Sequence, residues 1–126
     1  MQNTPVVSII DDDQTVRQSI QRLMRSRGLA ARTFASAEEF LGSPFMHQTA
    51  CLITDVQMPG MSGIELQAVM QKQGPSLPMI FLTAFPDERV QARALEAGAL
   101  GFLIKPFDAK DLINLVEAAL RDGGEH

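Results

Sequence analysis

Residues 6–13 are Val6-Val7-Ser8-Ile9-Ile10-Asp11-Asp12-Asp13, a short apolar run that ends directly in three acids. Short apolar runs bounded by polar or turn residues are typical of buried strands. Three more such runs end in a polar side chain: Cys51-Leu52-Ile53-Thr54 in Asp55, Pro78-Met79-Ile80-Phe81-Leu82 in Thr83, and Gly101-Phe102-Leu103-Ile104 in Lys105. In an open parallel sheet, functional groups gather at the carboxyl ends of the strands, so we expect these side chains to lie close together.

Segments with helical spacing alternate with these runs. After the first run, apolar residues recur at helical spacing until Gly28, and a weaker strand is expected over residues 29–34. Ser36 opens a short helix, and residues 42–48 are expected to form a loop. Because crossover connections are right-handed, the pattern predicts a single doubly wound (βα)5 domain of the α/β class. Its five-stranded parallel sheet would have the flavodoxin-like order 2-1-3-4-5.

Composition limits the classes of function. The 126 residues suit one domain, and a 45% hydrophobic content is enough for a core. With a net charge of −4 and no block of lysine and arginine, we expect no direct binding of nucleic acid. No apolar stretch approaches the roughly 20 residues that span a bilayer, so we expect no membrane association. The lack of a signal-peptide pattern and the single Cys51 favour a cytoplasmic location.

The polar residues at the strand ends form a chemically consistent set. Carboxylates from Asp11, Asp12 and Asp55 cannot all stay ionised at close range without a counter-charge, and a hard divalent cation supplies one. Asp55 would then be both a metal ligand and a nucleophile toward phosphorus. The Thr83 hydroxyl and the Lys105 ammonium would bind the phosphoryl oxygens. Taken singly, each residue is better explained as a cap, a turn residue or a solvated charge, and the coincidence at four strand ends favours function.

Four motifs together resemble the CheY-like receiver domain of two-component response regulators. They are Ile9-Ile10-Asp11-Asp12, Asp55-Val56-Gln57-Met58-Pro59-Gly60-Met61-Ser62-Gly63, Thr83-Ala84 and Lys105-Pro106-Phe107. The resemblance extends over essentially the whole chain, in the order and with the spacing of the family. It implies that the protein is a phosphorylation-activated switch, with Asp55 accepting a phosphoryl group from a histidine kinase or a small phosphodonor.

The same resemblance assigns the other site residues. Asp11, Asp12, Asp55 and the backbone carbonyl of Gln57 would hold Mg2+, for which Mn2+ can substitute. Thr83 and Lys105 would contact the phosphoryl group, and the bond before Pro106 is expected to be cis. Phe102 matches the aromatic switch residue, which turns inward when Thr83 moves toward the phosphoryl group; the alternative for an aromatic in a strand is simple core packing.

The resemblance also suggests an output. Phe34, the acidic start and Ala84-Phe85 resemble receivers joined to a helix-turn-helix DNA-binding domain, the FixJ/NarL class. In that case residues 1–121 are the receiver and residues 122–126 are a flexible tail or the start of a linker to an output domain. Phosphorylation would regulate transcription and promote a homodimer through the fourth helix, fifth strand and fifth helix. A stand-alone receiver is the alternative.

An enzyme is the main competing interpretation. Asp11-Asp12-Asp13-Gln14-Thr15 also resembles the Asp-x-Asp-x-Thr motif of haloacid-dehalogenase-type phosphatases, with Asp11 as nucleophile and Asp13 as general acid. That assignment leaves Asp55 unexplained, and no acid pair follows the fourth strand, where Thr83-Ala84-Phe85-Pro86 stands. A receiver fold that has lost phosphorylation is a second alternative, although no expected site residue is missing. We therefore expect no turnover enzyme, only autophosphorylation from phosphodonors and self-dephosphorylation.

Overall fold

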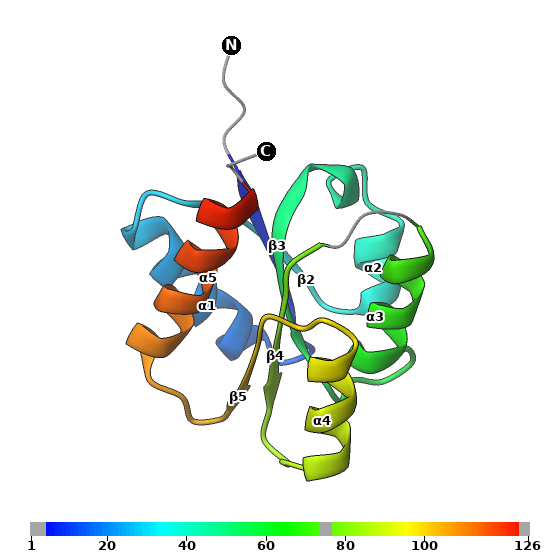
Figure 1. Ribbon diagram of the computed structural model, residues 1–126. Coiled ribbons are helices and arrows are strands. Elements are labelled where there is room, and N and C mark those ends of the chain that lie inside the picture. Colours follow the sequence, from blue (N-terminus) through cyan, green and yellow to red (C-terminus); the bar gives the residue numbers. More distant parts are fainter. Residues whose placement is uncertain (1–4, 74–76, 124–126) are drawn as a thin grey trace.

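The computed structural model describes residues 5–73 and 77–123, and within them five strands alternate with five helices (Figure 1). The elements are β1 Val6–Ile10, α1 Gln14–Ser26, β2 Ala30–Phe34, α2 Ala37–Leu41, a 3-10 turn Met46–Gln48, β3 Thr49–Asp55, α3 Gly63–Lys72, β4 Met79–Thr83, α4 Glu88–Glu96, β5 Gly101–Ile104 and α5 Ala109–Gly123. All strand pairs are parallel and the order is β2-β1-β3-β4-β5. The predicted doubly wound sheet is therefore confirmed.

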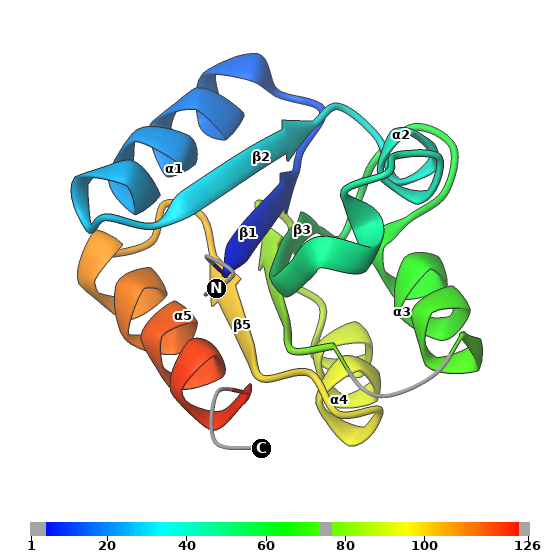
Figure 2. The ribbon, with the colours of Figure 1, turned by 90° about the horizontal axis from the view of Figure 1, so that it is seen from above.

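The sheet lies between two layers of helices. Helices α1 and α5 cover one face, and α2, α3 and α4 cover the other (Figures 1 and 2). Neighbouring strand residues alternate between the two faces, as Ile9 packs into the core under α1 and α5 while Ile10 packs into the opposite core. Every residue of β1 and β4 is buried, which explains why these strands are almost entirely apolar, with Ser8 and Thr83 as their only polar residues.

Side-chain caps fix where the helices begin. Asp13 accepts hydrogen bonds from the backbone N–H groups of Thr15 and Val16, so the third acid of the opening motif is the N-cap of α1. Ser62 and Glu65 form a capping box at the start of α3. Because α3 begins directly after the loop that follows Asp55, this capping box also fixes where that loop ends.

Three boundaries differ from the sequence prediction or extend beyond it. Residues 46–48, predicted as loop, form a 3-10 turn. Strand β3 begins at Thr49, two residues before the predicted apolar run, because Thr49 pairs with Val6 of β1. The Thr49 hydroxyl also hydrogen-bonds the Ser8 hydroxyl at 2.7 Å and donates to the Phe45 carbonyl at 2.9 Å. Helix α5 extends to Gly123, into the predicted tail, and residues 124–126 lie outside the described part of the chain.

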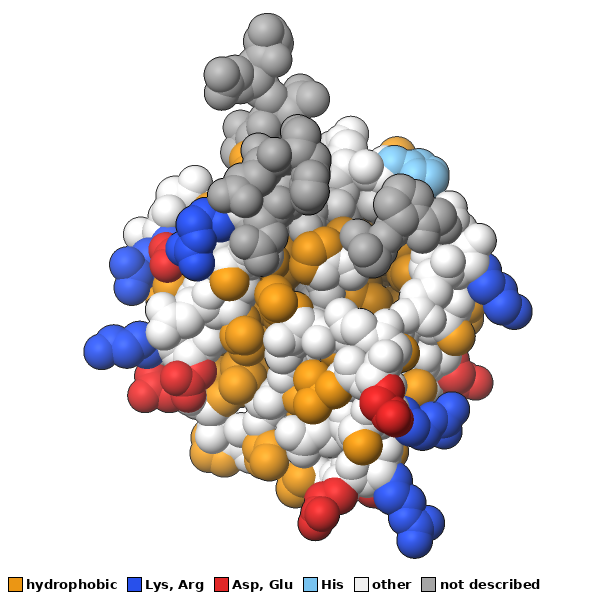
Figure 3. Space-filling model, in the orientation of Figure 1, with side chains coloured by type: hydrophobic (Ala, Val, Ile, Leu, Met, Phe, Trp, Pro, Cys, Tyr) orange, Lys and Arg blue, Asp and Glu red, His pale blue; other side chains and the backbone are white. Residues whose placement is uncertain are grey.

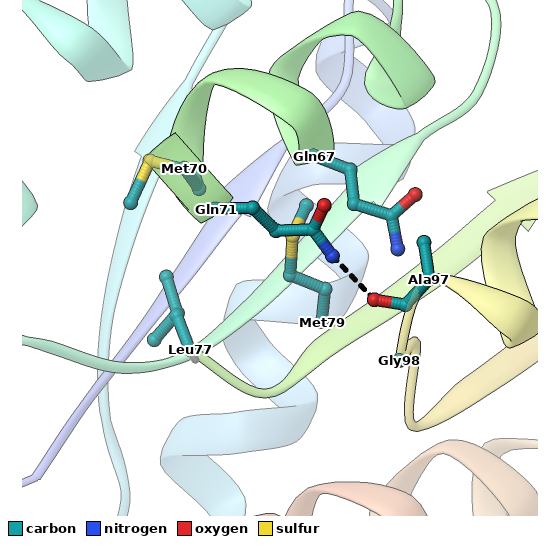
Figure 4. A pocket seen from close by; sticks show the side chains of 7 residues that line it. All are labelled: Gln67, Met70, Gln71, Leu77, Met79, Ala97 and Gly98. Carbon is teal, nitrogen blue, oxygen red and sulfur yellow. Dashed lines mark hydrogen bonds between the residues drawn. The ribbon is translucent and has the colours of Figure 1, made fainter. Parts of the chain in front are cut away.

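Two glutamines of α3 join this helix to the C-terminal end of α4. The Gln67 amide donates to the Ala94 carbonyl at 3.0 Å, and the Gln71 amide donates to the Ala97 carbonyl. Both side chains line a small pocket between α3, α4 and β4 (Figure 4), formed by Gln67, Met70, Gln71, Leu77, Met79, Ala97 and Gly98. These bonds satisfy carbonyls at the end of α4 and fix that end of the helix to the domain.

Candidate phosphoryl-transfer site

Three carboxylates meet where the strand order reverses. Asp11 and Asp12 follow β1, Asp55 ends β3, and one oxygen of each lies within 4.8 Å of the others. Asp11 and Asp55 are buried, with 1% and 7% of their surface exposed, whereas Asp12 is exposed. The two strands are neighbours that run in parallel, so their carboxyl ends bring the acids side by side. This cluster was predicted from the strand ends.

Lys105 supplies the positive charge of the site. Its ammonium group lies 2.8 Å from Oδ2 of Asp11 and 3.0 Å from Oδ2 of Asp55. Burial lowers the pKa of Lys105, but its hydrogen bonds to Asp11 and Asp55 outweigh this effect and raise the pKa above the ordinary value. The Lys105–Pro106 peptide bond is cis, as predicted.

Asp11 remains under electrostatic strain despite this partner. Burial raises the pKa of Asp11 above its ordinary value, and the opposing hydrogen bonds from Lys105 and the Asp13 backbone do not fully offset it. Asp11, Asp12 and Asp55 lie close to a single lysine ammonium, so the formal charge of the cluster is negative. Oxygen atoms of these three carboxylates are close enough together to hold a metal ion.

Backbone contacts hold the acidic residues in place. The Asp13 N–H donates to Oδ1 of Asp11 at 2.9 Å, and the Gln57 N–H donates to Oδ1 of Asp55 at 3.2 Å. The N–H of Gly63 donates to the Val56 carbonyl at 2.9 Å. A side chain at position 63 would overlap the Asp55 carbonyl oxygen, so the motif requires glycine here.

The two predicted switch residues lie on β4 and β5. Thr83 is buried, and its hydroxyl accepts the Phe85 N–H at 3.0 Å, while its carbonyl accepts the Lys105 N–H at 2.8 Å. Phe102 is half-buried and packs near Phe81, with ring centroids 6.1 Å apart. A backbone hydrogen bond thus connects Thr83 to Lys105, and the Phe102 side chain is only partly covered by the core.

The site opens to solvent through a shallow pocket. Its lining is formed by Asp11, Asp12, Asp13, Asp55, Gln57, Ala84, Phe85 and Lys105. Carboxylate and carbonyl oxygens are the ligands that Mg2+ prefers, and a lysine beside them can hold a phosphoryl oxygen. The donor set therefore fits a divalent cation and a phosphoryl group in the same pocket.

Two contacts around the site were not predicted. The Arg17 guanidinium donates to the Asp11 carbonyl at 2.7 Å, and the Glu38 carboxylate accepts the Met61 N–H at 2.9 Å. Arg17 is one turn into α1, so its position after the acid motif could have suggested the contact. Glu38 is 23 residues from Met61, and no local pattern indicates this pairing.

Residues 7–117 match the family of response regulator receiver domains. The chain belongs to this family. Receiver domains are the signalling domains of two-component response regulators, and the family in general works with histidine kinases. A phosphatase with Asp11 as nucleophile is not favoured, since the family match extends through β3, β4 and β5.

Known relatives of this receiver domain include named transcriptional regulators. Over 118 residues it is 40% identical to the transcriptional regulatory protein TdiR of Thauera aromatica, covering 94% of the chain and 52% of TdiR. Over 119 residues it is 39% identical to the transcriptional regulatory protein FixJ of Azorhizobium caulinodans, covering 94% of the chain and 56% of FixJ. The chain thus spans about half the length of the curated relatives it matches.

Solved structures agree with this assignment. The crystal structure of FixJ-N has a TM-score of 0.82 at 34% identity, covering 96% of each chain. The response regulator StyR has a TM-score of 0.86 at 38% identity, covering 98% of this chain and 62% of StyR. Among the described residues, none of the helices has the length and apolar character needed to cross a membrane.

Proposed function

We propose that this receiver domain is a phosphorylation-activated switch in which Asp55 accepts a phosphoryl group from a histidine kinase in a magnesium-dependent reaction. The observation that supports this most is the placement of Asp55. Its carboxylate shares the Lys105 ammonium with Asp11 and lines a pocket open to solvent. A nucleophile needs access to its donor, and the neighbouring cation stabilises the negative charge that arrives.

The residues have distinct roles in this reaction. A carboxylate oxygen of Asp55 attacks phosphorus and forms an acyl phosphate, while the bond from phosphorus to the donor breaks and the leaving group keeps the electron pair. Lys105 moves from the carboxylates to a phosphoryl oxygen, and Thr83 donates its hydroxyl hydrogen to another. Catalysis is limited to autophosphorylation from the donor and to self-dephosphorylation.

Asp11, Asp12, Asp55 and the Gln57 carbonyl would hold the Mg2+, and Mn2+ accepts the same oxygen ligands. The bound cation neutralises carboxylate and phosphoryl charge. Three carboxylates lie beside one lysine ammonium, so the formal charge of the ligand set favours an added cation even before phosphorylation.

Phosphorylation would act through Thr83 and Phe102. It adds about −1.5 to −2 charges and strong hydrogen-bond acceptors next to Lys105. Thr83 would leave the Phe85 N–H to meet these acceptors, and the half-buried Phe102 ring would move into the released space. Two packings of one core, biased by a local charge, are sufficient for a switch.

The output surface would be formed by α4, β5 and α5. Figure 3 shows hydrophobic side chains on this face, where Leu95 and Ile104 are exposed. A phosphorylation-dependent homodimer through this face would regulate transcription by way of an attached DNA-binding domain. The relatives named as transcriptional regulators, about twice as long as this chain, support this proposal. Such a regulator would act in the cytoplasm, where its kinase domain and DNA are found.

The test is the intact mass of the protein after incubation with acetyl phosphate, with and without magnesium. We expect the parent to gain one phosphoryl group, roughly 80 Da, only with magnesium, and Asp55→Asn to gain none. An adduct that persists in Asp55→Asn and is lost in Asp11→Asn would instead identify the phosphatase-type nucleophile. No adduct in any variant would reject the proposed chemistry.

A further inference from the structure

We infer that Glu38 positions the loop that contains Gln57 and thereby sets the affinity of the site for magnesium. The inference rests on the proposed function, because it assigns a role to a residue that supports the proposed metal ligands. Glu38 is exposed on α2 and lies outside the lining of the site pocket. It therefore acts through the loop and is not a ligand.

The contact joins two distant parts of the chain. Oε2 of Glu38 accepts the backbone N–H of Met61 at 2.9 Å. Met61 belongs to the loop of residues 57–62, which follows Val56 and leads from β3 to α3. Glu38 thus fastens this loop to α2.

The loop backbone is shaped to approach this carboxylate. A Cβ atom placed on Gly60 would lie 2.7 Å from Oε2 and 3.3 Å from Oε1 of Glu38. Gly60 also has a φ of +78°, a conformation that favours glycine. The short distance shows that the backbone at Gly60 lies directly against the Glu38 carboxylate, next to the N–H that it accepts.

Glu38 adds to the contacts that already hold the two ends of the loop. At its start the Gln57 N–H donates to Asp55, and at its end the Gly63 N–H donates to the Val56 carbonyl. The Ser62 N–H also donates to the Glu65 carboxylate of α3 at 2.9 Å. These contacts come from β3, Val56 and α3, whereas Glu38 holds the middle of the loop from α2. A loop held from both sides presents the Gln57 carbonyl without first having to be ordered, which lowers the cost of binding.

The neighbouring Glu39 provides a matched control. It has the same charge on the same short helix and is also exposed. Its carboxylate accepts the Ala35 N–H at 3.2 Å, and its own N–H is capped by Ser36 at 3.0 Å. Glu39 therefore serves the start of α2, and Glu38 serves the loop. Removing either charge changes the net charge equally, so a difference between the variants isolates the loop contact.

The experiment titrates magnesium alone into 15N-labelled protein and follows the amide signals of Gln57 and Met61, with hydrogen exchange of the Met61 amide as a second readout. We expect Glu38→Ala to raise the magnesium Kd about three- to tenfold and to speed Met61 exchange. Glu38→Gln should restore most of the affinity, since its amide oxygen still accepts a hydrogen bond. Glu39→Ala should keep the parent Kd.

The outcomes separate this inference from the proposed function. A parent that does not bind magnesium would reject the proposed metal site itself. If the parent binds but Glu38→Ala has the same Kd and Met61 exchange, the positioning role is overturned. Equal weakening in Glu38→Gln would assign the effect to charge, and equal weakening in Glu39→Ala would assign it to α2 stability; either would overturn the role proposed for Glu38.

Discussion

The ammonium group of Lys105 lies 3.0 Å from Oδ2 of Asp55, although β4 separates the strands from which these two residues come. The lysine side chain crosses the end of β4 and also reaches Asp11. The site is therefore assembled before any phosphoryl group arrives, because the Lys105 ammonium is shared between two buried carboxylates. A metal ion that binds later adds to this arrangement instead of creating it.

Replacing Lys105 tests how much the fold depends on this shared charge. Lys105→Gln leaves Asp11 and Asp55 close together without their cation, so we expect a loss of about 1–2 kcal/mol in the free energy of unfolding at neutral pH. Magnesium should restore more stability to this variant than to the parent, because it supplies the missing charge. Urea unfolding followed by circular dichroism, with and without magnesium, measures both effects.

Lys110→Gln is the control for Lys105→Gln. Lys110 is an exposed lysine at the start of α5, so its loss changes the net charge equally with little expected effect on stability. Equal stability of Lys105→Gln and Lys110→Gln in the absence of magnesium would show that the ion pairs of Lys105 with Asp11 and Asp55 contribute nothing to the free energy of unfolding.

The three consecutive acids should respond differently to substitution. Magnesium is expected to stabilise the parent, by about 2.7 kcal/mol when its concentration is a hundred times Kd. Asp11→Asn and Asp12→Asn should lose most of this gain, since each removes a proposed ligand. Asp13→Asn should keep it, because Asp13 is the N-cap of α1 and asparagine caps equally well.

Thermal unfolding at several magnesium concentrations measures the gain for each variant. A loss in Asp13→Asn as large as that in Asp11→Asn would place the third acid in the metal site.

Sequence patterns predicted the sheet and most of the site because four of the five strands, all except β2, are largely apolar runs that end at or just before a functional residue. Asp11, Asp55 and Lys105 could be identified in this way, since parallel strands bring their ends together. The start of β3 could not, because Thr49 is polar and its place in the strand depends on its pairing with Val6 of β1. The Glu38 contact was also missed, since its partner is a backbone N–H that any residue provides.

Close packing explains a glycine that sequence patterns alone do not. A Cβ at position 63 would overlap the Asp55 carbonyl, a backbone atom that cannot move without shifting the nucleophile. We expect Gly63→Ala to lower the free energy of unfolding by about 2 kcal/mol or more. At Gly42, the nearest atom to an added Cβ is 3.5 Å away and φ is −84°, so Gly42→Ala should stay within about 0.5 kcal/mol of the parent.

Chemical denaturation of the two glycine variants compares them directly. If Gly63→Ala proved as stable as Gly42→Ala, the conclusion that the start of α3 lies too close to the Asp55 carbonyl for a side chain would be wrong.

The buried thiol of Cys51 predicts how the domain responds to alkaline pH. Burial in β3 raises the pKa of Cys51 to about 12, from an ordinary value of 9.0. Between these values the unfolded chain loses the thiol proton while the folded chain keeps it, so stability falls as pH rises, by at most about 1.4 kcal/mol per pH unit. The pKa of Lys105 is also raised, but its contribution is lost only above its ordinary value of 10.5, and the chain has no tyrosine. The interval from pH 9 to about 10.5 therefore isolates the thiol.

Urea unfolding across this interval should show a free energy of unfolding that falls with pH for the parent and depends less on pH for Cys51→Ala. The packing lost in Cys51→Ala adds a cost that does not change with pH. Parallel curves for the two proteins would mean that the thiol ionises as easily in the folded domain as in the unfolded chain, and so that β3 is less tightly enclosed than described.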